Sequence, residues 1–146
     1  MKKLTYRSLI NAPKEKVWDL MLSHGSYETW SGAGWEGSTY DGQWKEGENI
    51  RFISPSGEGT LVHITELKPA DFLKAEHIAI LQKGGAEDRT SDLAKTWIGS
   101  KENYFFTGIN GTTELVVEIE ADPAWEKMFA DGWPAALNKL KEICEK

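Results

Sequence analysis

The three histidines of the sequence, His24, His63 and His77, are the side chains best suited to move protons near neutral pH. His63 and His77 lie in consecutive stretches whose composition predicts strands. If these strands pair, both imidazoles face one pocket and form an acid–base pair. The alternative is that each is an ordinary hydrogen-bonded or solvated histidine, because alternate residues of a half-buried strand face water.

Strand periodicity favours His77 over His63 as a pocket residue. The residues expected on the same side of its strand are apolar: Leu73, Ala75, Ala79 and Leu81. His63 shares its side with a more mixed set: Leu61, Thr65 and Leu67. An apolar side predicts the covered face of a sheet, so we expect His77 to face inward.

Besides these histidines, we find no sequence motif typical of a catalytic site. The chain has no Gly-x-Ser-x-Gly elbow and no phosphate-binding Walker loop. Its single cysteine, Cys144, has no partner for an internal disulfide, and no Cys/His pair has zinc-site spacing. We therefore expect no metal and no cofactor, and we favour a binding protein over an enzyme while leaving the enzyme open.

Length and charge restrict the class of protein further. The 146 residues predict one domain, 1–146, and the net charge of −6 argues against nucleic acid as a partner. No apolar run has the roughly 18 residues of a membrane span, and no apolar stretch follows the basic N-terminus as in a secretory signal. We expect a cytoplasmic protein, with seven tryptophans lining a core or an aromatic cavity.

The hydrophobic pattern predicts an α+β fold with about six or seven antiparallel strands. The predicted strands are Leu4–Ile10, Ser38–Tyr40, Asn49–Ser54, Thr60–Lys68, Phe72–Leu81, Glu102–Ile109 and Thr112–Ala121. Between the last two strands, Asn110-Gly111 is typical of a type I′ hairpin turn.

Three helices are predicted around this sheet. Two short ones follow the first strand, the first capped by Asn11 and the second at Tyr27–Trp30. A long amphipathic helix begins at Asp122-Pro123 and continues to the end of the chain, with a kink or break near Ala130–Trp133 because Gly132 and Pro134 interrupt it.

The long helix is the only element able to cover the apolar face of the sheet, so pocket residues should lie between the two. The predicted pocket wall is Tyr6, Trp30, His77, Phe105, Thr107, Met128, Phe129 and Trp133. Plain core packing is the alternative for the aromatic and Met residues of the helix. Trp30, Trp35 and Trp44 either line the mouth of the pocket or anchor a glycine-rich loop.

The polar connection Gln82–Thr96 is either a lid over the pocket or a solvated loop, and Ser91 is expected to cap one helical turn inside it.

Five segments carry a resemblance to a known family. They are residues 10–19 (INAPKEKVWD), 27–30 (YETW), 59–69 (GTLVHITELKP), 113–117 (TELVV) and 132–141 (GWPAALNKLK). In this order and spacing they resemble the START-like (SRPBCC) helix-grip superfamily. Within it, they resemble the activator of heat-shock protein 90 ATPase homologue (AHSA-type) family. The resemblance covers essentially the whole chain.

The resemblance implies a curved sheet gripping the C-terminal helix, with a cavity between them. Members of the superfamily bind lipids, sterols, polyketides or plant hormones, some cyclise polyketides, and some are co-chaperones. Our first hypothesis is therefore a domain that binds a small apolar or amphipathic ligand. The alternatives are a co-chaperone-like module that contacts a chaperone protein, and a cyclase- or hydrolase-like enzyme that uses His77 or His63 as a base.

Overall fold

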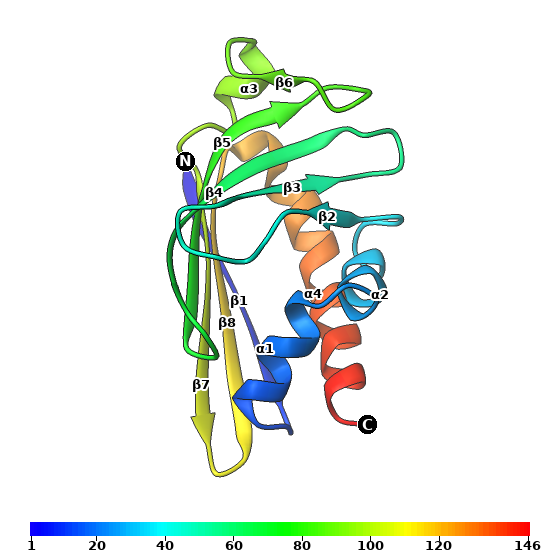
Figure 1. Ribbon diagram of the computed structural model, residues 1–146, viewed down its shortest axis with the longest axis vertical. Helices are drawn as coiled ribbons and strands as arrows, with labels where there is room; N and C mark the ends of the chain where they lie inside the picture. The colour runs from blue at the N-terminus through cyan, green and yellow to red at the C-terminus, as the bar shows by residue number, and fades with distance from the viewer.

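An antiparallel sheet that curls around the C-terminal helix organises the protein, in a computed structural model that describes residues 1–146 (Figure 1). The strands are β1 (Lys2–Ile10), β2 (Thr39–Asp41), β3 (Asn49–Ile53), β4 (Gly59–Lys68), β5 (Phe72–Leu81), β6 (Glu87–Asp88), β7 (Lys101–Ile109) and β8 (Thr112–Ala121). The helices are α1 (Lys14–Leu22), α2 (Ser26–Gly32), α3 (Asp92–Lys95) and α4 (Glu126–Cys144), with a 3₁₀ turn at Pro123–Trp125.

The strand order is β1-β8-β7-β5-β4-β3-β2, and the two-residue β6 pairs with β5. All pairs are antiparallel. The predicted α+β helix-grip fold is confirmed, with one short strand beyond the six or seven expected. None of the helices combines the length and the hydropathy that a membrane span requires.

The hairpin between β7 and β8 determines which of their side chains face α4. Asn110 and Gly111 have positive φ angles of 51° and 81°, which confirms the predicted type I′ turn. In the resulting register Phe106 pairs with Leu115 and Tyr104 pairs with Val117. Since cross-strand partners share a face, these residues all lie on the inner, buried side.

A β-bulge in β5 separates residues that simple alternation places together. Val62 pairs with His77 and Leu61 pairs with Ala79, which leaves Ile78 without a partner. His77 faces inward as predicted, but the expectation that Ala79 shares its face is wrong. Ala79 packs with Leu61 and Leu81 in a small separate cluster.

The α4 helix runs continuously through Gly132 and Pro134, so the break that was one of the two expectations near Ala130–Trp133 does not occur. Pro134 lacks an N–H, which deprives the Ala130 carbonyl of its helical partner, but Ala130 is exposed, where solvent can replace that partner. Gly132 has a packing role instead. A Cβ placed there would lie 2.6 Å from ring carbons of Trp35, so only glycine lets that indole approach the helix this closely.

The N-terminal corner also differs from the prediction. Pro13, not Asn11, is the N-cap of α1, and it makes no side-chain cap bond. The backbone N–H of Asn11 donates to the Glu145 carboxylate at 2.8 Å. This contact ties the end of β1 to the C-terminal end of the chain, beyond the last turn of α4.

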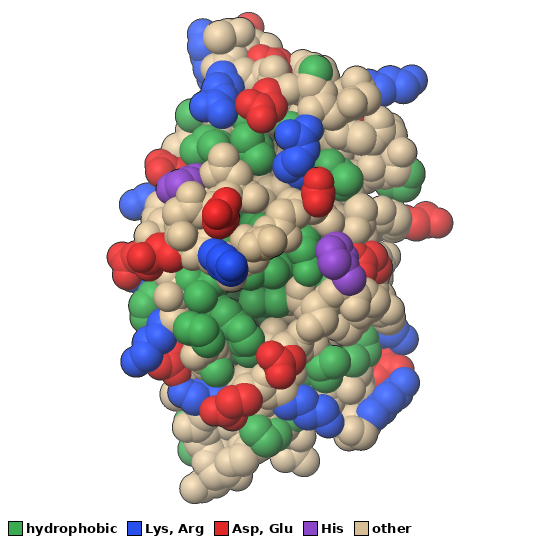
Figure 2. Space-filling model, in the orientation of Figure 1, with side chains coloured by type: hydrophobic (Ala, Val, Ile, Leu, Met, Phe, Trp, Pro, Cys, Tyr) green, Lys and Arg blue, Asp and Glu red, His purple; other side chains and the backbone are tan.

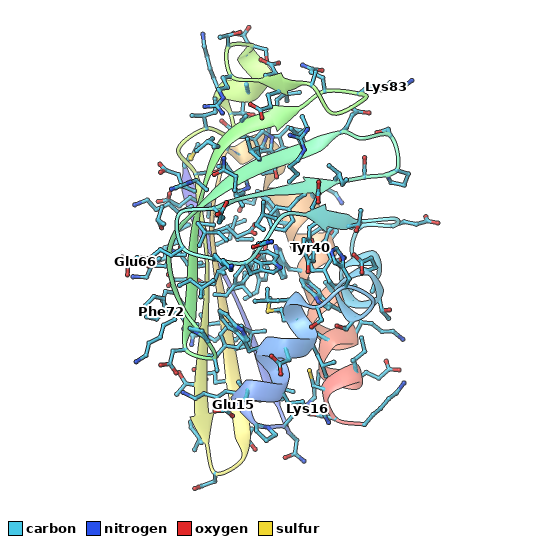
Figure 3. The ribbon with its side chains drawn as sticks, in the orientation of Figure 1. Glu15, Lys16, Tyr40, Glu66, Phe72 and Lys83 are labelled. Atoms are coloured by element: carbon cyan, nitrogen blue, oxygen red, sulfur yellow. The ribbon has the colours of Figure 1, made fainter.

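The buried core lies between the inner face of the sheet and the helices, and includes Cys144, which is fully buried. Lys and Arg side chains are interspersed with Asp and Glu over the face drawn in Figure 2. In Figure 3, Glu66 and Phe72 point away from the helices on the outer side of the sheet, whereas Tyr40 lies on the helix side.

Candidate ligand-binding pocket

A pocket of about 360 Å³ lies between the sheet and the first half of α4. Its size falls within the usual range for small-molecule sites. The lining residues are Tyr27, Trp30, Trp35, Glu36, Ser38, Phe52, Ile53, Ser54, Glu58, Gly59, Thr60, His77, Ile80, Leu81, Gln82, Leu93, Trp97, Glu102, Tyr104, Trp125, Met128, Phe129 and Trp133. Most of them are hydrophobic, and aromatic rings dominate.

Five of the eight predicted wall residues lie in this wall: Trp30, His77, Met128, Phe129 and Trp133. Tyr6 faces the helix but stands behind the wall. Its ring stacks on Trp133 with centroids 6.3 Å apart, so it supports that indole without lining the cavity.

Phe105 and Thr107 do not line the pocket, so the prediction that they belong to its wall is wrong. Both lie on the outer face of β7, where Phe105 pairs with Phe72. Figure 3 shows Phe72 pointing away from the helices. The prediction chose the wrong alternation of β7, and a shift of one residue moves every side chain to the other face.

His63 and His77 face opposite sides of the sheet, so of the two alternatives the acid–base pair is excluded. His63 lies on the outer side of β4, half-buried, with its Nδ1 2.8 Å from Asn49 Oδ1. His24 lies away from the cavity, stacked on Tyr40 at 4.1 Å. His77 is therefore the only histidine that lines the pocket.

Trp133 is the centre of the aromatic wall. Its ring lies 5.2 Å from Trp35, 6.0 Å from Trp30 and 6.1 Å from Tyr104, measured between centroids. It is 3% exposed, and its indole N–H has no hydrogen-bond partner. A buried donor without a partner costs folding free energy, and this N–H is covered by the surrounding rings rather than presented to the cavity.

A second aromatic group lies beside Trp97. This indole is 5.2 Å from both Trp125 and His77 and 5.8 Å from Phe129. Trp97 follows α3, so the polar connection between β5 and β7 contributes directly to the wall.

The connection Gln82–Thr96 contains two short elements, β6 and α3. Ser91 caps α3 as predicted, because its hydroxyl accepts the Ala94 N–H at 3.1 Å. Gln82 and Leu93 line the pocket, which favours the lid interpretation over a loop that only meets solvent.

The tryptophans of the glycine-rich segment separate into two roles. Trp30 and Trp35 line the pocket, whereas Trp44 does not and packs on Tyr40 and Phe52. The first alternative, that these tryptophans line the pocket, therefore applies to Trp30 and Trp35. The second, that they anchor the glycine-rich loop, applies to Trp44.

A buried carboxylate and a tyrosine form the main polar group of the pocket. Glu102 is 7% exposed, and the Tyr104 hydroxyl donates a hydrogen bond to its carboxylate. Burial, and after it the negative charge of Glu102, raise the pKa of Tyr104 well above its usual value. Tyr104 therefore stays protonated and continues to donate.

His77 is held in one orientation by Ser100. Its Nδ1 lies 3.1 Å from the Ser100 carbonyl oxygen and 2.9 Å from the Ser100 hydroxyl. Since a carbonyl only accepts, this contact assigns the proton to Nδ1 and leaves Nε2 as an acceptor in the neutral ring. Burial lowers the pKa of His77, partly opposed by the Glu102 charge, so the neutral ring predominates at pH 7.

This lowered pKa predicts a pH-dependent stability. The unfolded chain binds a proton near pH 6.5, whereas folded His77 binds it only at lower pH, so acidification through this window favours unfolding. We expect the melting temperature to fall as pH drops from 8 toward 5.5, and His77→Gln to flatten that slope. His63→Gln, at an outer-face histidine, is the control, and an unchanged slope in His77→Gln would contradict the assignment.

Sequence reasoning missed several important lining residues: Tyr27, Trp97, Glu102, Tyr104 and Trp125. For Glu102 and Tyr104 a signal was present. The hairpin turn, combined with the inward side of β8, places them opposite Ile119 and Val117. Trp97 lies in an irregular connection, where no periodicity predicts orientation.

No cluster of three His, Cys, Asp or Glu side chains is arranged to hold a metal ion. The groups that line the pocket include aromatic faces, the buried Glu102 carboxylate and the Nε2 acceptor of His77.

The fold and its pocket define a helix-grip protein of the START-like class. The chain belongs to the family described as Activator of Hsp90 ATPase homolog 1-like protein, whose model matches residues 11–145. This confirms the resemblance found in the sequence. A search of curated proteins finds no match.

Solved structures of low identity share the fold. The solution structure of the Aha1 dimer from Colwellia psychrerythraea is 18% identical, covers 99% of this chain and 97% of its own, and has a TM-score of 0.72. CalU16 from Micromonospora echinospora is 17% identical, with 97% and 73% covered and a TM-score of 0.66. DynU16, a putative protein in the dynemicin biosynthetic locus, is 17% identical, with 100% and 48% covered and a TM-score of 0.69. At these identities the likeness concerns the fold alone.

Proposed function

We propose that this protein binds a small apolar or amphipathic molecule in the pocket between the sheet and α4. The observation that carries the proposal is a cavity of about 360 Å³ lined mainly by aromatic and aliphatic side chains and containing a few buried polar groups. Apolar area removed from water contributes about 25 cal/mol per Å² of binding free energy, and the polar groups orient the ligand.

The packing around Trp133 supports a cavity that is already formed. Tyr6, Trp30, Trp35 and Tyr104 surround this indole, so its position does not depend on a ligand. A wall that is ordered beforehand lowers the entropy cost of binding.

The test fills the cavity without removing core contacts. Thr60 is half-buried in β4 and lines the pocket, so Thr60→Trp places an indole inside it. We expect the uncharged dye N-phenylnaphthylamine to bind the wild-type protein with enhanced emission, and Thr60→Trp to reduce that affinity at least about tenfold, the loss of 1.4 kcal/mol.

Thr107→Trp is the matched control, since it adds the same side chain to an exposed position on the outer face of β7. It should bind the dye as the wild type does. Equal binding by both variants would place the dye elsewhere, and absence of binding to the wild type would contradict the proposal.

The family membership also keeps the co-chaperone hypothesis open as the second candidate. A pull-down of a heat-shock protein 90 chaperone that is unaffected by Thr60→Trp would support it, because that contact would use the outer surface. A protein that binds the dye and retains no chaperone leaves ligand binding as the function.

A further inference from the structure

The charged side chains that line the pocket are all acidic. Glu36, Glu58 and Glu102 are part of the wall, whereas no Lys or Arg is. Glu36 and Glu58 are exposed at its rim, and Glu102 is 7% exposed inside it. The pocket therefore combines a buried carboxylate with an acidic entrance.

The inner polar atoms are mainly hydrogen-bond acceptors. The carboxylate of Glu102 receives only the Tyr104 hydroxyl, which leaves acceptor capacity on its oxygens. His77, with its proton on Nδ1 against Ser100, has an acceptor at Nε2. A ligand that meets these atoms must bring donors.

The rest of the wall is equally suited to positive charge. Indole and phenol faces attract cations through their quadrupole, and tryptophan does so most strongly. Trp97, Trp125 and Trp133 line the same cavity as Tyr104. Aromatic faces and a carboxylate together replace the hydration that a cation loses on entering.

From these observations we propose that the ligand is an organic amine, bound as its ammonium form, whose charged group pairs with Glu102 while its apolar body lies against the tryptophans. This inference rests on the proposed ligand-binding function and names the chemical class of the ligand. Glu36 and Glu58, at the entrance, attract such a cation in a salt-dependent manner.

The experiment compares three probes that share one apolar body and differ in charge: naphthylmethylamine, naphthalenemethanol and naphthoic acid. Their affinities are measured by calorimetry at pH 7 and low salt. We expect the amine to bind about tenfold more tightly than the alcohol, because a hydrogen bond to a charged group is worth more than a neutral one. The acid should bind most weakly.

Variants then assign the preference to one carboxylate. Glu102→Gln should lower the affinity for the amine about tenfold and change that for the alcohol little, since it keeps the size of the side chain. Glu76→Gln, on the outer face of the neighbouring strand β5, is the control and should leave all three affinities unchanged.

The outcomes separate the two proposals. An alcohol that binds as tightly as the amine to the wild-type protein overturns the amine assignment, whether or not Glu102→Gln folds. Retention of the amine preference in a folded Glu102→Gln variant also overturns it. Failure of the dye and of all three probes to bind would instead refute ligand binding itself.

Discussion

Replacing Trp133 by alanine is expected to lower the free energy of unfolding by about 3–5 kcal/mol, the usual cost of truncating a large buried aromatic residue. Trp133 is 3% exposed and contacts rings from β1, α2 and β7 and from the segment after α2. Its removal leaves a void that several elements would have to move together to fill, so little of the loss is recovered by relaxation.

The same substitution should abolish binding of the dye, because Trp133 separates the pocket from Tyr6 and the core behind it. Chemical denaturation followed by circular dichroism measures the stability, and dye titration at low temperature measures binding by the folded protein. Trp18→Ala is the control, since Trp18 packs on Phe106 outside the pocket. It should lose stability but keep the dye, and loss of the dye in both variants would contradict a specific role for Trp133.

Trp133→Phe distinguishes the indole N–H from the bulk of the ring. Phenylalanine keeps an aromatic face toward Trp30 and Trp35 but removes the unpartnered Nε1. Replacing an unsatisfied donor by an apolar group offsets part of the cavity cost. We expect this variant to be clearly more stable than Trp133→Ala in the same denaturation experiment, and equal stability would contradict a stabilising role for the aromatic face toward Trp30 and Trp35.

Most of the fold was predictable because local signals agreed with one another. The Asn110-Gly111 turn has two positive φ angles and allows one register, and that register aligns Leu115 with Phe106. The apolar spacing of the C-terminal segment also predicts α4, although Pro134 lies within it. Tertiary packing outweighs the local cost of that proline.

Most of the wrong predictions at the candidate site concern features that the alternation of apolar and polar residues along a strand does not reveal. The bulge at Ile78 adds one residue to β5, so alternation counted across it gives the wrong face for Ala79. Trp97 lies in a connection without regular structure. Phe105 is a different case, because the hairpin register pairs it with Val116 on the outer face, and that register can be derived from the Asn110-Gly111 turn alone.

Replacing Gly59 by alanine is the second substitution for which we expect a large loss of stability. Gly59 begins β4 between β3 and β5, pairing with Ile53 on one side and Leu81 on the other. A Cβ there would overlap the backbone carbonyl of Phe52. No side-chain rotation relieves a clash with backbone, so the pairing of β3 with β4 must open locally.

This opening should cost about 3 kcal/mol, the upper part of the range for overpacking. It should also weaken dye binding, because Phe52, Ile53 and Gly59 all line the pocket. Gly32→Ala at the end of α2 is the matched control, since a Cβ there meets no atom within 4 Å. Its stability should change by at most about 1 kcal/mol. If chemical denaturation gives equal midpoints for the two variants, the close approach of β3 and β4 at Gly59 does not constrain the fold, and the pocket does not depend on that approach for its shape.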